Sequence, residues 1–201
     1  LHLSLRRQRQ MCIRDRYADW EGSYLASQLN QSKQWSVKTG SVAETVSSLG
    51  GFQTQIDYQI DNQLPQIDLL VLIGGNAWST ENENLRALVA SRLKHNQPVA
   101  AICGAVDYLA RNGLLTGYRH TGNAQYLWRQ DKEYVNGQDF VATQVVTDCN
   151  LVTANGTAAL AFTNQVLKMI AFLPSAEVDK ATDLYQLGFY QYCKQYGNPF
   201  F

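Results

Sequence analysis

The segment Pro98-Val-Ala-Ala-Ile-Cys103-Gly104-Ala-Val-Asp-Tyr-Leu-Ala-Arg-Asn-Gly113 joins an apolar run to a helical pattern through a Cys-Gly pair. A short apolar run after a proline and before a helix is typical of a buried parallel strand that enters a helix through a tight turn. Gly104 permits that turn. The helix N-terminus would stabilise a thiolate, so a lowered pKa and a nucleophilic thiol are expected at Cys103. The alternative is a small buried cysteine that fills a strand end.

The chain has 201 residues, enough for one α/β domain with a full core. Its 45% hydrophobic and 17% charged residues are usual for a soluble globular protein and exclude a disordered, collagenous or coiled-coil chain. The longest uninterrupted apolar run, at 69–73, is far shorter than the roughly 18 residues of a membrane span. No membrane association is therefore predicted.

The four cysteines, Cys12, Cys103, Cys149 and Cys193, are widely spaced and form no CxxC pair. This pattern indicates neither a zinc site nor a disulfide scaffold, and it suits the reducing cytoplasm. Neither a metal nor a cofactor is predicted. Residues 1–16 carry five of the 17 lysines and arginines, which leaves 12 basic and 16 acidic residues elsewhere, a net charge of −4. This balance argues against binding to nucleic acid.

Residues 1–16 occupy the place where such a domain has its first central strand, yet they are rich in arginine. A strand covered on both faces is nearly all apolar, and this one would bury unpaired guanidinium groups. A basic targeting or nucleic-acid-binding tail is one alternative, although the segment lacks the apolar region of a secretory signal. We favour a different interpretation, in which Met11-Cys-Ile-Arg-Asp-Arg16 is a translated sequencing adapter and the segment is non-native or disordered. The native first strand would then be missing, and residues 17–201 would form a single domain.

After residue 16 the pattern alternates between strands and helices. The predicted helices are 20–30, 81–93 with Ser79 or Thr80 as the cap, 104–112, a short stretch at 125–130, 157–170, and 178–192. The predicted strands are 34–39, a hairpin within 42–60, 68–73, 98–102, 141–147 and 150–154. This order implies an α/β fold with a mainly parallel sheet and a site at the carboxyl ends of its strands.

Three segments should therefore meet at one edge of the sheet: Cys103, the turn Gly74-Gly75-Asn76, and Asp19-Trp20-Glu21. A reactive cysteine needs a group that favours its thiolate, donors for an oxyanion and a proton carrier. Gly75 and Gly104 offer backbone N–H donors, although the Gly-Gly pair is also consistent with a plain tight turn.

Two side chains are candidates to support the thiol. Glu21 lies in the first turn of a helix, where a carboxylate is stabilised and where an acid without a role is also common. His120 lies in a glycine-flanked loop and is expected to be exposed and able to move protons. The alternative for His120 is a surface histidine without a function.

Six motifs occur in the order in which they stand in one known family. They are Tyr-Ala-Asp-Trp-Glu21, Leu-Ile-Gly-Gly-Asn76, Ala-Ala-Ile-Cys-Gly104, Arg-Asn-Gly113-Leu-Leu, Arg-His-Thr-Gly122 and Leu-Val-Thr-Ala-Asn-Gly156-Thr. From residue 17 to about residue 168 the chain resembles the DJ-1/PfpI superfamily, in particular its members labelled class I glutamine amidotransferase-like or intracellular-protease-like.

The resemblance implies a flavodoxin-like three-layer α/β/α sandwich with Cys103 on a nucleophile elbow. Glu21 would be a protonated acid that hydrogen-bonds to the sulfur, which requires a raised carboxyl pKa. Gly75 and Gly104 would supply the oxyanion donors, His120 would lie near the cysteine, and Asn76 would contact the substrate. Homodimers are common in the family, so a homodimer is an expectation that rests on the resemblance alone.

One departure from the related class I glutaminases limits the expected activity. Those enzymes use a Cys-His-Glu triad with a downstream His-x-Glu pair, and no histidine follows His120 in this chain. We therefore expect an enzyme that acts on small carbonyl or amide substrates, by hydrolysis or by a glyoxalase or deglycase-like reaction, and not a glutaminase. A stress-response protein that uses the same thiol as a redox sensor is the alternative. A scaffold with a decayed site is the third interpretation.

Overall fold

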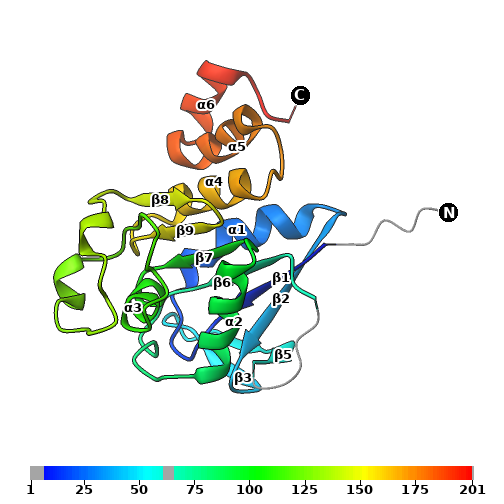
Figure 1. Ribbon diagram of the computed structural model, residues 1–201. Coiled ribbons are helices and arrows are strands. Elements are labelled where there is room, and N and C mark those ends of the chain that lie inside the picture. Colours follow the sequence, from blue (N-terminus) through cyan, green and yellow to red (C-terminus); the bar gives the residue numbers. More distant parts are fainter. Residues whose placement is uncertain (1–6, 61–65, 201) are drawn as a thin grey trace.

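The computed structural model describes residues 7–60 and 66–200, and it contains a seven-stranded sheet in the order β5-β2-β1-β6-β7-β9-β8 (Figure 1). The strands are β1 (Arg7–Cys12), β2 (Trp35–Ser41), β5 (Tyr58–Gln59), β6 (Leu69–Leu72), β7 (Val99–Ile102), β8 (Val145–Asp148) and β9 (Leu151–Ala154). All neighbours pair in parallel except β8 and β9. The predicted hairpin within 42–60 is confirmed as β3 (Thr45–Ser47) and β4 (Gln53–Gln55).

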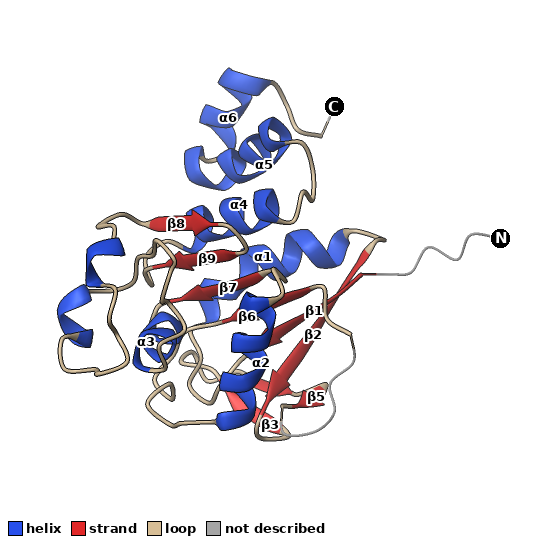
Figure 2. Ribbon diagram, in the orientation of Figure 1, coloured by secondary structure: helices blue, strands red, loops and turns tan. Residues whose placement is uncertain are grey.

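Helices cover both faces of the sheet, so the predicted three-layer sandwich is confirmed (Figure 2). One face is covered by α1 (Asp19–Gln31) and α4 (Ala159–Met169), and the other by α2 (Glu83–Lys94) and α3 (Gly104–Arg111). Alternate residues of β6 enter the two cores, Leu69 and Val71 on one side and Leu70 and Leu72 on the other. A strand buried on both faces must be apolar throughout, as this one is. Among the helices of the described ranges, none is long and apolar enough to cross a bilayer.

Residues of the segment that we interpret as non-native form the strand β1 at the position of the first central strand. β1 pairs in parallel with β2 on one side and β6 on the other, which gives the main-chain groups of both neighbours their partners. Pairing of this kind depends on the backbone and tolerates an unusual sequence. Residues 1–6 of the suspect segment lie outside the described residues, and its non-native origin stays a prediction.

Arg14, just after β1, is buried with part of its guanidinium group unpaired, as the arginine-rich sequence predicts. Its side chain is only 5% exposed, and its Nε and Nη2 atoms have no hydrogen-bond partner within the described part of the chain. Nη1 donates to the carbonyl oxygens of Ala77 and Thr80, and the guanidinium carbon lies 4.7 Å from the centre of the Trp78 ring. Buried N–H groups without acceptors destabilise the fold.

Two expected helix boundaries are wrong. α2 begins after Asn82, whose side chain accepts a hydrogen bond from the Leu85 N–H at 2.7 Å, and neither Ser79 nor Thr80 caps it. The single helix expected over 178–192 is two helices, α5 (Ser175–Leu187) and α6 (Phe189–Tyr196). Gly188 separates them with a φ of 76°, a backbone conformation that favours glycine.

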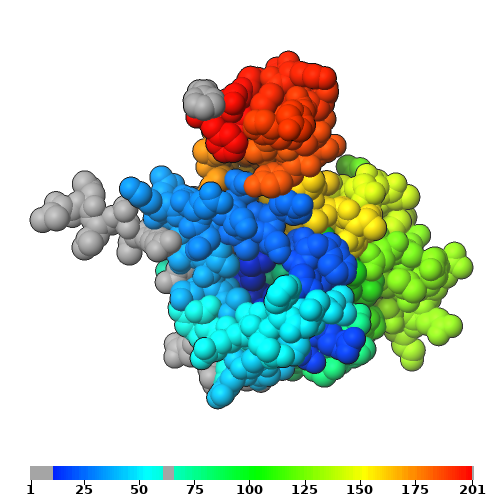
Figure 3. Space-filling view, turned by 180° about the vertical axis from the view of Figure 1, so that it is seen from behind, coloured from blue at the N-terminus to red at the C-terminus, as the bar shows by residue number. Residues whose placement is uncertain are grey.

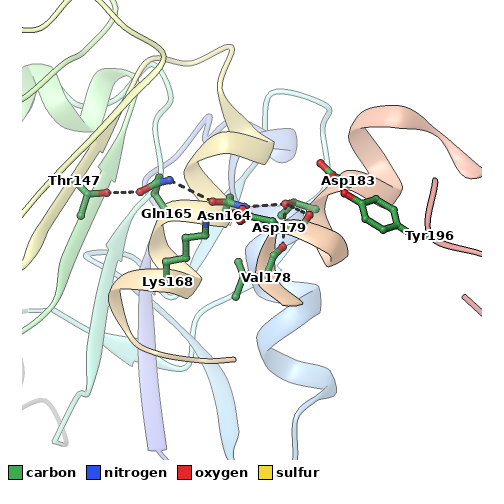
Figure 4. Close-up of polar contacts among 9 residues, drawn as sticks. Thr147, Asn164, Gln165, Lys168, Val178, Asp179, Asp183 and Tyr196 are labelled. Carbon is green, nitrogen blue, oxygen red and sulfur yellow. Dashed lines mark hydrogen bonds and ion pairs between the residues drawn. The ribbon is translucent and has the colours of Figure 1, made fainter. Parts of the chain in front are cut away.

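Helix α5 packs on α4 and α6 packs on α5, and the two form the lobe coloured orange to red in the view from behind (Figure 3). Figure 4 shows the polar contacts that hold them. Asp179 on α5 accepts from Asn164 at 2.8 Å and from Lys168 at 2.5 Å, both on α4. The Tyr196 hydroxyl on α6 donates to Asp183 at 2.6 Å. The lobe is therefore attached to the sandwich through α4, and the Tyr185 ring on α5 also packs edge-on against Tyr24 on α1 at 5.1 Å between centroids.

Candidate active site

Cys103 occupies the turn between β7 and α3, as predicted. Its φ of 59° and ψ of −130° are a strained conformation for a residue with a side chain. The Cys103 N–H donates to the carbonyl of Ala154 at the end of β9 (2.9 Å), which fixes the turn against the neighbouring strand. The residue is half-buried at the carboxyl edge of the sheet.

Glu21 projects from the first turn of α1 and is fully buried. Its Oε2 atom accepts a hydrogen bond from the Gly74 N–H at 2.8 Å. Its Oε1 atom is buried without a hydrogen-bond partner in the described residues, and the Cys103 side chain lies beside the carboxyl group. Burial raises the pKa of Glu21 to about 7. The interactions with Cys103 and Gly74 lower the pKa, but by less than burial raises it.

Two glycines allow the acid and the thiol to meet. A Cβ atom on Gly156 would lie 2.9 Å from Cys103 Sγ and 3.1 Å from Glu21 Oε1. A Cβ atom on Gly74 would lie 2.4 Å from Glu21 Oε2 and 2.6 Å from Cys103 Cβ. Any larger residue at either position would displace the two functional groups. The predicted convergence of the three strand ends is confirmed by these contacts.

Asn123 also contacts the sulfur, and the sequence analysis did not identify it. Its Nδ2 atom donates to Cys103 Sγ at 3.2 Å, while its Oδ1 atom accepts from the Gly156 N–H at 2.9 Å. The second bond orients the carboxamide so that its NH₂ group faces the thiol. The only signal in the sequence is the position of Asn123 directly after Gly122, in the same loop as His120.

The electrostatics of the thiol differ from the expected lowering of its pKa. Burial raises the pKa of Cys103 to about 11. The hydrogen bonds from Asn123 and from the Gly104 N–H act in the opposite direction, and the negative charge of Glu21 adds to the increase. The helix N-terminus therefore does not outweigh desolvation. When Glu21 is protonated its repulsion disappears and the carboxyl becomes a potential donor to the sulfur.

His120 is buried, so the expectation that it is exposed is wrong. Its Nδ1 atom lies 2.8 Å from the Tyr118 carbonyl oxygen and its Nε2 atom lies 2.8 Å from the Tyr134 hydroxyl. Its ring packs edge-on against Tyr134 and Phe140. Burial lowers its pKa, which favours the neutral imidazole. Both ring nitrogens of His120 thus contact groups other than the thiol, and Asn123 is the residue that donates to the sulfur.

The Gly74-Gly75-Asn76 turn lies beside Cys103, where the prediction puts it. Gly75 has a φ of 154°, and a Cβ atom on Gly104 would lie 2.9 Å from the Gly75 carbonyl oxygen and 3.8 Å from its nitrogen. The amides of Gly75 and Gly104 are therefore close neighbours. The Asn76 N–H donates to the Arg16 carbonyl at 3.1 Å, and Asn76 is exposed. Its contact with a substrate stays a prediction.

Comparisons with known proteins agree with this geometry. The family model described as "DJ-1/PfpI family" matches residues 10–169. "Uncharacterized protease YdeA" of Bacillus subtilis is 52% identical over 188 residues, which cover 94% of this chain and 95% of that protein. "Uncharacterized protease YoaZ" of the same organism is 34% identical and covers 76% of this chain and 78% of its own length.

Solved structures show the same fold. The thiJ/pfpI family protein from Bacillus anthracis has a TM-score of 0.83 and 28% identity, with 96% of this chain and 98% of that one covered. The DJ-1 superfamily protein Atu0886 from Agrobacterium tumefaciens has a TM-score of 0.81 and 27% identity, with 90% and 98% covered. With a matched family model, two similar relatives and this shared architecture, the chain belongs to the DJ-1/PfpI family.

Proposed function

We propose that this protein is a cysteine-dependent hydrolase of small amide or carbonyl substrates, with Cys103 as the nucleophile and Glu21 as the proton carrier. The observation that supports it most is the meeting of the two groups across Gly156, whose Cβ position lies 2.9 Å from Cys103 Sγ and 3.1 Å from Glu21 Oε1. A carboxyl with a pKa of about 7 is suited to both accept and return a proton at neutral pH.

The reaction on an amide runs through a covalent intermediate. The Cys103 thiol transfers its proton to Glu21 Oε1 while the sulfur bonds to the carbonyl carbon, and the electron pair of the C=O bond moves to the oxygen. The N–H groups of Gly75 and Gly104 would stabilise that oxyanion. The C–N bond then breaks and Glu21 protonates the leaving amine. Water next gives a proton to Glu21 and attacks the thioester, and the departing sulfur recovers that proton as the acid is released.

This chemistry differs from that of a class I glutaminase because no histidine is involved. In the described structure the polar side chains that interact with the Cys103 thiol are Glu21 and Asn123, and His120 is engaged by Tyr118 and Tyr134. Asn123 cannot accept a thiol proton as imidazole does, so it would stabilise a sulfur anion as a donor only. Proton transfer is thereby assigned to Glu21 alone.

Turnover by the purified protein tests the proposal. Wild type, Cys103→Ser, Glu21→Gln and the control Cys149→Ser, at an exposed cysteine, would be assayed with a peptide p-nitroanilide panel and with methylglyoxal. We expect Cys149→Ser to retain activity, Cys103→Ser to lose it, and intact-protein mass spectrometry to detect an acyl adduct on Cys103. Equal turnover by Cys103→Ser and wild type would refute the proposal.

The redox-sensor alternative is supported by the partial exposure of Cys103. Hydrogen peroxide would oxidise the Cys103 thiolate to sulfenate, with water as the other product. Trapping with dimedone measures that reaction in the same set of variants. Rapid, Cys103-dependent trapping without turnover of any substrate in the panel would favour the sensor over the hydrolase.

A further inference from the structure

A cavity of about 540 Å³ lies next to the candidate active site. It is bounded by the loops 121–125 and 140–144 and by Asn155. Asn123 belongs to both places, because it lines the cavity and its Nδ2 atom donates to Cys103 Sγ. Asn155 directly precedes Gly156, whose Cα faces the thiol. A molecule bound in the cavity could therefore reach the sulfur.

The walls of the cavity carry hydrogen-bonding groups but no charge. None of the residues that line it has an ionisable side chain. Thr143, Gln144 and Asn155 supply hydroxyl and carboxamide groups, and Phe140 and Ala142 supply apolar surface. A volume of this size is typical of a small-molecule or peptide site. A carboxylate or phosphate would meet no cation among these residues, so the lining gives anionic ligands no advantage over uncharged ones.

Two carboxamides in the wall present hydrogen-bond donors. The Thr157 N–H donates to Asn155 Oδ1 at 3.0 Å, and the Thr157 hydroxyl lies 2.7 Å from Asn155 Oδ1 and 3.1 Å from Gln144 Oε1. Both amide oxygens therefore face Thr157. Their NH₂ groups have no protein acceptor among the described residues, so they are available to carbonyl oxygens of a bound molecule.

The main chain of His120 joins the two loops before any ligand binds. The His120 N–H donates to the Asp139 carbonyl at 3.1 Å, and the His120 carbonyl accepts from the Val141 N–H at 2.8 Å. Its ring packs against Phe140 with centroids 6.0 Å apart. The buried histidine therefore makes the cavity a preformed one, which lowers the entropic cost of binding.

From these observations we infer that the cavity binds an uncharged peptide segment of the substrate, with its main-chain carbonyl oxygens on Gln144 and Asn155. The inference rests on the proposed function, because it places the remainder of an amide substrate beside the nucleophile. A peptide whose reacting amide lies at Cys103 would extend past Asn123 into the cavity.

Alkylating reagents that share one reactive group test the inference without a known substrate. Bromoacetyl-glycyl-alanine amide is neutral, bromoacetyl-glycyl-alanine carries a carboxylate, and bromoacetamide has no peptide. Each would be reacted with wild type, Gln144→Ala, Ala142→Glu and the control Ala87→Glu, which adds the same charge at an exposed site on α2. The measured quantity is kinact/KI for Cys103 by mass spectrometry.

We expect the neutral peptide to react with saturation and about tenfold faster than the anionic one. Loss of one neutral hydrogen bond in Gln144→Ala should reduce its kinact/KI by roughly 3- to 10-fold. Ala142→Glu should lower the kinact/KI of the neutral peptide because the longer side chain fills part of the cavity, and Ala87→Glu should leave it unchanged. Equal rates for both peptides, or equal effects of the two glutamate variants, would overturn the inference.

A second measurement separates this inference from the proposed function. If bromoacetamide fails to label Cys103, the nucleophile is wrong, but the cavity can still be tested by binding alone. Acetyl-glycyl-alanine amide would be titrated into Cys103→Ser and followed by NMR chemical shifts. We expect shifts in the two loops that disappear in Cys103→Ser/Ala142→Glu, and no shifts there would overturn the inference by itself.

Discussion

Replacing Glu21 by glutamine should change how the stability of the protein depends on pH. The pKa of Glu21 rises from 4.5 in the unfolded chain to about 7 in the folded one because the carboxyl is buried. Between these two values the folded state holds a proton that the unfolded state has lost, so stability falls as pH increases. At about 1.4 kcal/mol per pH unit, the loss between pH 4.5 and pH 7 is about 3 kcal/mol. Above that window the contribution of Glu21 is constant.

Urea unfolding at pH 4.5 and at pH 8 measures this effect in wild type, Glu21→Gln and the exposed control Glu44→Gln. The control should follow wild type, whereas Glu21→Gln should lose about 3 kcal/mol less between the two pH values. The comparison between variants is needed because burial lowers the pKa of His120 from 6.5, which makes stability rise with pH below that value. Parallel pH dependences for wild type and Glu21→Gln would show that Glu21 is not a buried, protonated acid.

Three further predictions concern neighbouring groups. Gly156→Ala should lower the free energy of unfolding by about 1–3 kcal/mol in urea titrations, since its Cβ would lie 2.9 Å from Cys103 Sγ; unchanged stability would contradict this packing. His120→Gln should leave the rate of Cys103 alkylation by iodoacetamide within about twofold of wild type. A tenfold loss of rate would instead support His120 as the proton carrier. Arg14→Leu should stabilise the fold by about 1–3 kcal/mol, because two buried guanidinium nitrogens lack hydrogen-bond partners in the described structure. A lower Tm for this variant would speak against that account.

Most of the sandwich could be predicted because its strands are buried on both faces. Runs such as 69–73 and 98–102 are apolar throughout, and only a covered parallel strand requires that. The same reasoning does not identify β1, whose place in the sheet depends on main-chain pairing with β2 and β6. Gly188 shows a related limit, since a helical pattern continues across a residue whose backbone ends the helix.

The candidate site was predictable only where residues follow directly from strand ends. Cys103 and Gly74 each follow a strand, and Glu21 begins the helix after β1, so the topology brings them together. The loop 120–123 has no such constraint. His120 was chosen for the chemistry of imidazole, but burial among aromatic rings decides its role, and the turn of the loop brings Asn123 to the sulfur instead. Such placement depends on tertiary contacts that no local pattern contains.

The asparagine beside the thiol has a consequence for the acid–base behaviour of the whole site. A cysteine paired with histidine gives two titrations near neutrality and a bell-shaped dependence of rate on pH. With Asn123 in contact with the sulfur, and with the pKa of the thiol raised to about 11, Glu21 is left as the group that titrates near pH 7. The rate would then follow a single titration: the protein would be inactive in acid and would become active as the Glu21 carboxyl ionises.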